Sequence, residues 1–224
     1  MKKLAIIGYG KMGRLIEQLA PEYDFAIHAR VDLNDDFASA RGADVAVEFT
    51  IPDAVASNVE KHATLGVPMV IGTTAWSKDM NRVRQAAEKH GVGIVWSPNF
   101  SIGVNVFSRL VREAARMLAN EPQYGAWAWE IHHSTKKDAP SGTLTKLVEE
   151  MRAGGYKGNI DASSNRAGAH PGTHEIGFDS TADTITLRHT ARSREGFARG
   201  ALKAAQWIIG KKGVYEFSEV LFER

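Results

Sequence analysis

The densest group of reactive side chains lies between residues 130 and 143. This segment holds two imidazoles, two amines, four hydroxyls and a glycine: Glu130-Ile131-His132-His133-Ser134-Thr135-Lys136-Lys137-Asp138-Ala139-Pro140-Ser141-Gly142-Thr143. Imidazoles and amines can donate protons. An apolar run typical of a strand, Ala126–Trp129, precedes the segment, and a helical run, Leu144–Met151, follows it. A loop that leads into a helix also presents backbone N–H groups to an anion, so we expect proton transfer and anion binding here.

These residues also have plainer interpretations. Adjacent residues on a strand point to opposite faces, so at most one of His132 and His133 faces a given pocket, and the other can be a packed histidine. Lys137 can be a solvated surface charge, and Ser141-Gly142-Thr143 can be no more than a helix N-cap. For this segment taken in isolation, the functional and the plain interpretations are about evenly matched.

A second motif lies at the start of the chain. Gly8, Gly10 and Gly13 have the spacing of the dinucleotide-binding fingerprint, directly after the apolar run Leu4–Ile7. Such glycines permit a tight turn, close approach of a pyrophosphate and close helix packing. Asp32 ends the second expected strand, 19 positions after Gly13, where an acidic residue should bind ribose hydroxyls. A glycine turn without a ligand would not explain this context, so we predict a dinucleotide site.

Apolar strands alternate with helical segments through the first 96 residues. We expect helices at Arg14–Ala20, Ala54–Leu65 and Met80–His90, and strands at Leu4–Ile7, Phe25–Val31, Val45–Phe49, Pro68–Ile71 and Gly93–Trp96. This alternation predicts an α/β fold with an N-terminal Rossmann-type, doubly wound parallel sheet.

The pattern changes after residue 103. We expect helices over Val104–Leu118 and Gly196–Ile209, a loop over Gly154–Pro171, and strands around Trp127, at His174–Phe178 and at Thr184–His189. This half predicts an α+β second domain containing an open mixed sheet. Because the last helix can return to cover the first domain, we expect a dinucleotide-binding domain from residues 1–102 and 195–224, and a substrate-binding domain from residues 103–194.

The composition excludes several classes of protein. A net charge of +2 argues against a partner that is a nucleic acid, and the absence of Cys excludes disulfides and thiolate metal sites. There is no His-Glu-x-x-His motif, and Pro171-Gly172 between His170 and His174 argues against a helix, so we predict no metal site. The N-terminal apolar run is too short for a signal peptide or a membrane span, so we expect a cytoplasmic protein without a membrane partner.

Residues 130–143 resemble the signature of the dihydrodipicolinate reductase family, E-x-H-H-x-x-K-x-D-A-P-S-G-T, and meet each of its fixed positions. Other pieces similar to that family follow in order: the glycine loop, Glu48-Phe49-Thr50-x-Pro52, Gly72-Thr73-Thr74, Pro98-Asn99-Phe100-Ser101-x-Gly103-Val104-Asn105, and His189-x-Ala191-x-Ser193-Arg194-x-x-Phe197-Ala198-x-Gly200-Ala201. The resemblance therefore covers nearly the whole chain.

The resemblance implies an oxidoreductase of diaminopimelate–lysine biosynthesis. With NADH or NADPH, such an enzyme reduces the cyclic dicarboxylate dihydrodipicolinate, also written as 4-hydroxy-tetrahydrodipicolinate, to tetrahydrodipicolinate. By resemblance, His132 would donate the proton with Lys136 as its catalytic partner, and the substrate would be held by His133, Ser141, Gly142 and Thr143. The family is usually a homotetramer that assembles through the sheet of its second domain.

The resemblance also implies a cofactor site on the first domain. Its residues would be Gly8, Gly10, Lys11, Met12, Gly13, Asp32, Phe49, Gly72, Thr73, Thr74, Pro98, Asn99, Phe100, Arg194 and Phe197. Arg194 and Phe197 would also join the two domains. Asp32 is followed by Leu33, Asn34, Asp35 and Asp36 rather than by an Arg, so we expect NADH to serve at least as well as NADPH. Arg30 or Lys11 could favour NADPH instead.

The chain departs from the family pattern at a few places. The stretch from Asp32 to Asp44 is short, Glu48 stands where the family more often has Asp, Ala75 where it usually has Gly, and Thr173 where it often has Glu. Two other classes of protein remain open. Another two-domain nicotinamide enzyme, such as an aspartate or homoserine dehydrogenase, would explain the glycine loop but not residues 132–143. A non-catalytic NAD-binding sensor would not need His132 and Lys136 together.

Overall fold

The computed structural model describes residues 1–33 and 35–223, and Asn34 and Arg224 lie outside this range. The chain divides into two compact units. Unit 1 consists of Met1–Ile102 and Arg194–Arg224, and unit 2 of Gly103–Ser193. Each unit has its own sheet and its own core.

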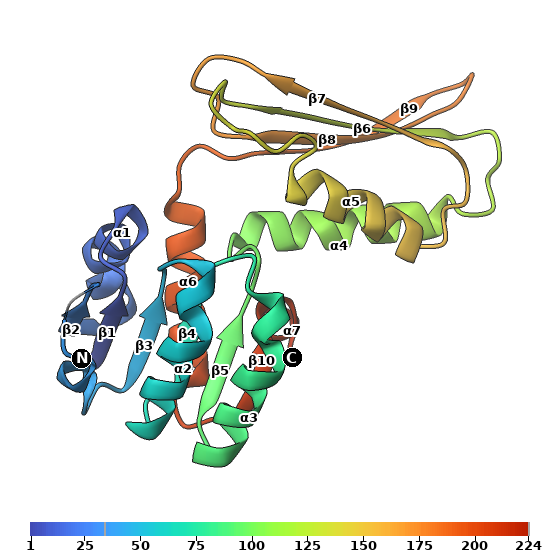
Figure 1. The fold of residues 1–224 in the computed structure, drawn as a ribbon. Helices are drawn as coiled ribbons and strands as arrows, with labels where there is room; N and C mark the ends of the chain where they lie inside the picture. Colours follow the sequence, from blue (N-terminus) through green and yellow to red (C-terminus); the bar gives the residue numbers. More distant parts are fainter. Residues whose placement is uncertain (34, 224) are drawn as a thin grey trace. The chain divides into compact units, whose positions relative to one another are not determined.

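Unit 1 contains a parallel sheet in the order β10-β5-β4-β3-β1-β2 (Figure 1). Its strands are β1 (Lys2–Ile7), β2 (Phe25–Val31), β3 (Val45–Glu48), β4 (Met69–Ile71), β5 (Gly93–Trp96) and β10 (Gly213–Glu216). The inner strands are almost wholly apolar because helices cover both of their faces, which is the usual state of a parallel sheet. The predicted Rossmann-type sheet is confirmed, and β10 extends it by a strand that the sequence pattern did not reveal.

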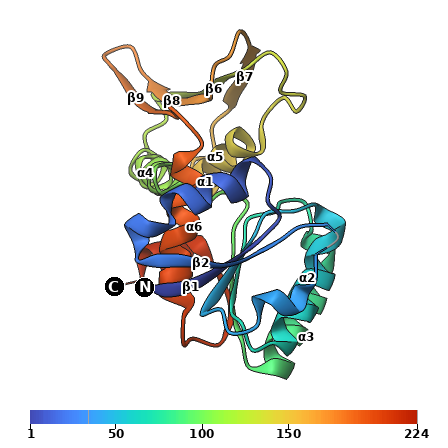
Figure 2. The same ribbon diagram turned by 90° about the vertical axis from the view of Figure 1, so that its left-hand side faces the viewer.

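The helices of unit 1 form a layer on each face of its sheet (Figure 2). One layer consists of α1 (Lys11–Leu19), α6 (Glu195–Ile208) and α7 (Phe217–Phe222), and the other of α2 (Val55–Thr64) and α3 (Met80–His90). Short 3₁₀ turns occur at Ala20–Tyr23, Phe37–Ala40, Pro52–Ala54 and Ser77–Asp79. The helix α6 comes from the C-terminal part of the chain and packs on α1 and the central strands.

Unit 2 contains a mixed sheet in the order β7-β6-β8-β9. Its strands are β6 (Gly125–His132), β7 (Ile160–Arg166), β8 (Thr173–Asp179) and β9 (Thr184–Thr190); only β6 and β7 run parallel. The helices α4 (Ile102–Met117) and α5 (Gly142–Ala153) cover one face of this sheet (Figure 1). The predicted α+β unit with an open mixed sheet is confirmed. None of the described helices is long and apolar enough to span a membrane.

The prediction of a loop over Gly154–Pro171 was wrong, because β7 lies within it. The strand is largely exposed, and its sequence Ile-Asp-Ala-Ser-Ser-Asn-Arg shows no apolar alternation. It forms because the edge of β6 offers backbone partners from Ala126 to His132. A strand stabilised by its neighbour rather than by its own apolar face leaves little trace in the sequence.

His62 predicts a pH-dependent stability. This residue of α2 is fully buried, and neither ring nitrogen has a hydrogen-bond partner among the described residues. Burial, with a smaller effect of Lys61, lowers the pKa of His62 to about 4. The unfolded chain therefore binds the extra proton between about pH 6.5 and 4, so stability falls as the pH drops through that window.

We expect this group to cost about 3 kcal/mol of unfolding free energy at pH 4 relative to pH 7. Urea unfolding of the His62→Leu variant across this range should show a correspondingly weaker pH dependence. The exposed His90 on α3 supplies the control variant His90→Leu. Equal pH dependence in the wild type and in His62→Leu would refute the prediction.

Candidate active site

A pocket of about 440 Å³ lies at the carboxyl ends of β1, β3 and β4 in unit 1. Strands β1 and β3 are neighbours in the sheet although β2 separates them in sequence. The strand order reverses at this point, and open α/β sheets bind their ligands at such switch points. The lining residues are Gly10, Lys11, Met12, Phe49, Thr50, Pro52, Gly72, Thr73 and Thr74.

The glycine loop shapes one wall of the pocket. Gly8 has φ +89°, and a Cβ there would collide with the carbonyl oxygen of Phe49. A Cβ at Gly13 would collide with the carbonyl oxygen of Gly8. By contrast, a Cβ at Gly10 would meet no atom within 4 Å, and Gly10 caps α1 without a side-chain hydrogen bond. The start of α1 is thus open to a ligand, and its N–H groups favour a pyrophosphate.

The structure gathers part of the predicted cofactor set. The residues of that set that line the pocket are Gly10, Lys11, Met12, Phe49, Gly72, Thr73 and Thr74. Those that do not line it are Gly8, Gly13, Asp32, Pro98, Asn99, Phe100, Arg194 and Phe197. The Phe100 ring packs on Phe217 in the core, so it supports the fold rather than the pocket. Thr50 and Pro52 also line the pocket. They belong to the motif Glu48-Phe49-Thr50-x-Pro52, but the sequence did not predict that they bind the cofactor.

Asp32 lies just beyond β2, and its neighbour Arg30 is already paired. The Arg30 guanidinium forms an ion pair with Glu17 and lies 5.7 Å from the Tyr9 ring centroid. The same pairing lowers the pKa of Glu17 to about 2, chiefly through the Arg30 hydrogen bond. Arg30 is therefore held by a carboxylate on α1, and its charge is partly neutralised.

Ala75 follows the Gly72-Thr73-Thr74 turn with φ +62°. This left-handed conformation costs an alanine about 1 kcal/mol and costs a glycine nothing. Glycine also loses more entropy on folding, so we expect Ala75→Gly to raise the unfolding free energy by about 0.5 kcal/mol. Urea unfolding measures the difference, with the exposed Ala38→Gly, which has no positive φ, as control. A destabilised Ala75→Gly variant would count against strain at this position.

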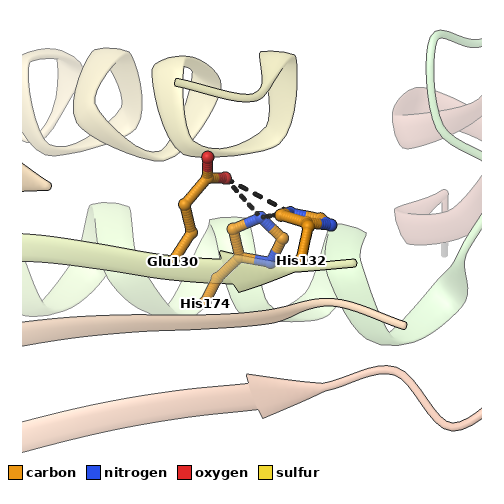
Figure 3. A group of neighbouring side chains, drawn as sticks. All are labelled: Glu130, His132 and His174. Carbon is orange, nitrogen blue, oxygen red and sulfur yellow. Dashed lines mark hydrogen bonds and ion pairs between the residues drawn. The ribbon is translucent and has the colours of Figure 1, made fainter. Parts of the chain in front are cut away.

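In unit 2 a buried carboxylate, that of Glu130, organises the reactive segment (Figure 3). Oxygen Oε1 accepts hydrogen bonds from the Ser141 N–H at 2.9 Å, Ser164 Oγ at 2.9 Å and Arg166 Nη2 at 2.8 Å. Oxygen Oε2 accepts from the Ser141 hydroxyl and lies 3.3 Å from Nε2 of both His132 and His174. Burial alone would raise the pKa of Glu130, but these donors outweigh it and lower the pKa to about 2.

The strand β6 places Glu130 and His132 on the same face, toward α4 and α5. Burial lowers the pKa of His132, with Lys136 and Arg166 lowering it further against the effect of Glu130. Burial also lowers the pKa of His174 to about 4. A Cβ on Gly172 would lie 2.8 Å from Cε1 of His132, so the absence of a side chain at Gly172 leaves room for the His132 ring.

The other predicted residues of the segment surround this cluster unevenly. Lys136 donates to both oxygens of Asp138, at 2.7 and 2.8 Å. His133 lies beyond β6 and pairs with the Thr135 hydroxyl, so it does not share the environment of His132. The two imidazoles therefore differ, but His133 lies off the strand rather than on its opposite face.

The start of α5 has a side-chain N-cap and also backbone N–H groups that a ligand can reach. The Ser141 side chain accepts from Leu144 N, which confirms the N-cap interpretation, and its own hydroxyl is committed to Glu130. The first N–H groups of a helix have no acceptor within it, so Gly142 and Thr143 can offer theirs to an anion. A Cβ on Gly142 would meet no atom within 4 Å, so this approach is open.

The sequence assigned no role to several residues around His132. Glu130 was visible as the first letter of the motif, and His174 only as half of a rejected metal pair. Arg166 and Ser164 lie on β7, in the segment predicted as loop, so no local signal marked them. Both side chains reach Glu130 because β7 pairs with β6, although they are 34 and 36 positions from Glu130 in the sequence.

Family models cover almost all of the chain. The model described as "Dihydrodipicolinate reductase, N-terminus" matches residues 2–100, and that described as "Dihydrodipicolinate reductase, C-terminus" matches residues 103–221. The chain belongs to the dihydrodipicolinate reductase family. The 4-hydroxy-tetrahydrodipicolinate reductases of Christiangramia forsetii and Methanospirillum hungatei are 33% and 34% identical to it, over 97% and 99% of this chain and the same shares of theirs.

Solved structures show the same fold. A dipicolinate-bound dihydrodipicolinate reductase from Paenisporosarcina sp. TG-14 matches with a TM-score of 0.82 and 22% identity, over 98% of this chain and 99% of that one. An aspartate dehydrogenase from Thermotoga maritima matches with a TM-score of 0.53 and 12% identity, over 92% of this chain and 96% of that one. The resemblance to the dihydrodipicolinate reductase family that the motifs indicated is therefore confirmed.

Proposed function

We propose that this protein reduces dihydrodipicolinate, supplied as 4-hydroxy-tetrahydrodipicolinate, to tetrahydrodipicolinate with NADH or NADPH, in diaminopimelate–lysine biosynthesis. The proposal rests on family membership together with one feature of the site. The buried His132 lies beside Glu130, in the same segment as Lys136 and the open start of α5. A non-catalytic sensor would have no use for this arrangement.

The proposed chemistry divides between the two units. A bound reduced nicotinamide supplies the hydride, and the open glycine loop of unit 1 fits its pyrophosphate. In unit 2, His132 donates the proton that balances the added hydride, and Lys136 assists it by stabilising negative charge. The N–H groups of Gly142 and Thr143 bind a substrate carboxylate, with His133 nearby in sequence and Ser141 fixing the helix start.

Oxidation of NADH in the presence of enzymatically prepared substrate tests this function. We expect turnover with that substrate, and no reduction of NAD⁺ with aspartate or homoserine, the substrates that the competing dehydrogenases oxidise. Pyridine-2,6-dicarboxylate, a planar analogue, should compete with substrate. Turnover confined to an amino acid, or no turnover with firm NADH binding, would overturn the proposal.

For the cofactor, we predict that NADH is used at least as well as NADPH. The Asp32 carboxylate repels a 2′-phosphate, and Arg30 is already paired with Glu17. Steady-state kinetics with both cofactors measures kcat/KM for each. A value about tenfold higher with NADPH, equivalent to about 1.4 kcal/mol, would refute the prediction and point to Arg30 or Lys11 as the phosphate partner.

We also propose that the protein is cytoplasmic and that it forms a homotetramer through the sheet of unit 2. The sheet face opposite α4 and α5 bears Trp127 and Trp129, both partly exposed, and no described helix of unit 2 covers it. Such aromatic side chains are enriched in subunit interfaces. Sedimentation equilibrium of the wild type and of a Trp129→Glu variant measures the assembly, and a monomeric wild type would refute it.

A further inference from the structure

Three donor atoms of unit 2 form a nearly equilateral triangle (Figure 3). They are Nε2 of His132, Nε2 of His174 and Oε2 of Glu130, and the three distances between them are each 3.3 Å. All three side chains are buried. Two imidazole nitrogens and one carboxylate oxygen are a ligand set that catalytic zinc sites use.

The size of the triangle matches that of a metal coordination site. Zinc binds imidazole nitrogen and carboxylate oxygen at about 2.0–2.2 Å in a tetrahedron, which places the ligand atoms about 3.3–3.5 Å apart. Hydrogen bonds from N–H groups to a carboxylate are shorter, at about 2.7–2.9 Å when charge-assisted. The spacing of 3.3 Å therefore matches one face of a zinc tetrahedron and is longer than a charge-assisted hydrogen bond.

The surroundings orient the carboxylate for such a role. Its Oε1 accepts from the Ser141 N–H, Ser164 and Arg166, while its Oε2 accepts from the Ser141 hydroxyl and faces the two imidazoles. Outer hydrogen bonds of this kind fix the ligands of metal sites. The Arg166 guanidinium opposes a cation, but it lies on Oε1 rather than between the three donors.

We propose that His132, His174 and Glu130 bind a zinc ion, with the fourth position left to water. This departs from the sequence expectation of no metal site. Zinc would occupy Nε2 of His132 and so inhibit proton donation; that consequence rests on the proposed function, whereas the binding itself does not.

The test uses full-length protein freed of metal by a chelator, without substrate or cofactor. Titration with Zn²⁺ against a chromophoric chelator should give one site per chain. Co²⁺ should give the intense visible absorption of a tetrahedral site. His174→Asn should weaken Zn²⁺ binding about 100-fold or more. His170→Asn, which removes a neighbouring imidazole outside the triangle, should leave it unchanged.

The wild type alone can overturn the proposal, by binding no zinc or by giving only the weak spectrum of six-coordinate Co²⁺. Equal loss of binding in His170→Asn would overturn it as well. Circular dichroism of the metal-free variants checks folding, and His132→Asn or Glu130→Gln replaces His174→Asn if that variant does not fold. Zinc binding by a protein without reductase activity would support the site and refute the proposed function.

Discussion

Replacing His132 with Asn or Lys136 with Ala should each lower turnover about 10²–10⁴-fold, the usual contribution of a positioned proton donor. Hydride addition to a conjugated imine leaves negative charge on the ring, and an aligned donor must neutralise it. His132 is fixed for this role by Glu130 and by the space over Gly172. Lys136 is close enough to lower the pKa of His132 and carries the charge needed beside a dicarboxylate.

The matched control for Lys136 is its exposed neighbour Lys137, whose Ala variant should keep full turnover. NADH affinity, measured by fluorescence titration, should remain within about twofold in all three variants, because the glycine loop belongs to unit 1. A His132→Asn or Lys136→Ala enzyme with normal turnover would remove that residue from the mechanism. Parallel loss of NADH binding would indicate a folding defect instead.

Local patterns predicted the parts of the site that local structure positions. The glycine loop lies between a strand and a helix that are adjacent in sequence, so spacing alone located Gly8, Gly10 and Gly13. Strand alternation predicted separate environments for His132 and His133, but these arise because β6 ends at His132 and leaves His133 in the loop. The helix start at Ser141 followed from its residue type.

The parts that depend on distant contacts could not be read in this way. Glu130 acquires its donors from Arg166 and Ser164 on β7 and from His174 on β8, and no local pattern links these positions. The polar sequence of β7 indicated a loop because the strand depends on its pairing with β6. The packing of Phe100 against Phe217 likewise required the returning C-terminal segment.

Glu130→Ala should lower the unfolding free energy of the protein by about 3–5 kcal/mol, the cost of removing one partner of a buried ion pair. The substitution leaves the Arg166 guanidinium, only 16% exposed, without its carboxylate. It also strips acceptors from the Ser141 N–H and hydroxyl, both buried. Urea unfolding at pH 7 measures the loss, and Glu149→Ala, on the exposed face of α5, is the control.

A double-mutant cycle separates the ion pair from the rest of the network. Glu130→Gln keeps the shape and one acceptor oxygen but removes the charge, and Arg166→Met removes the opposing charge while filling a similar volume. If the buried pair dominates, the double variant should be about 2 kcal/mol more stable than the sum of the two single losses, because neither charge is then left alone. Simple additivity would instead assign the role of Glu130 to the hydroxyl and backbone donors of Ser141 and Ser164. In that case the carboxylate would mainly hold the start of α5 against the sheet through hydrogen bonds. Its charge would then act chiefly on the imidazoles of His132 and His174.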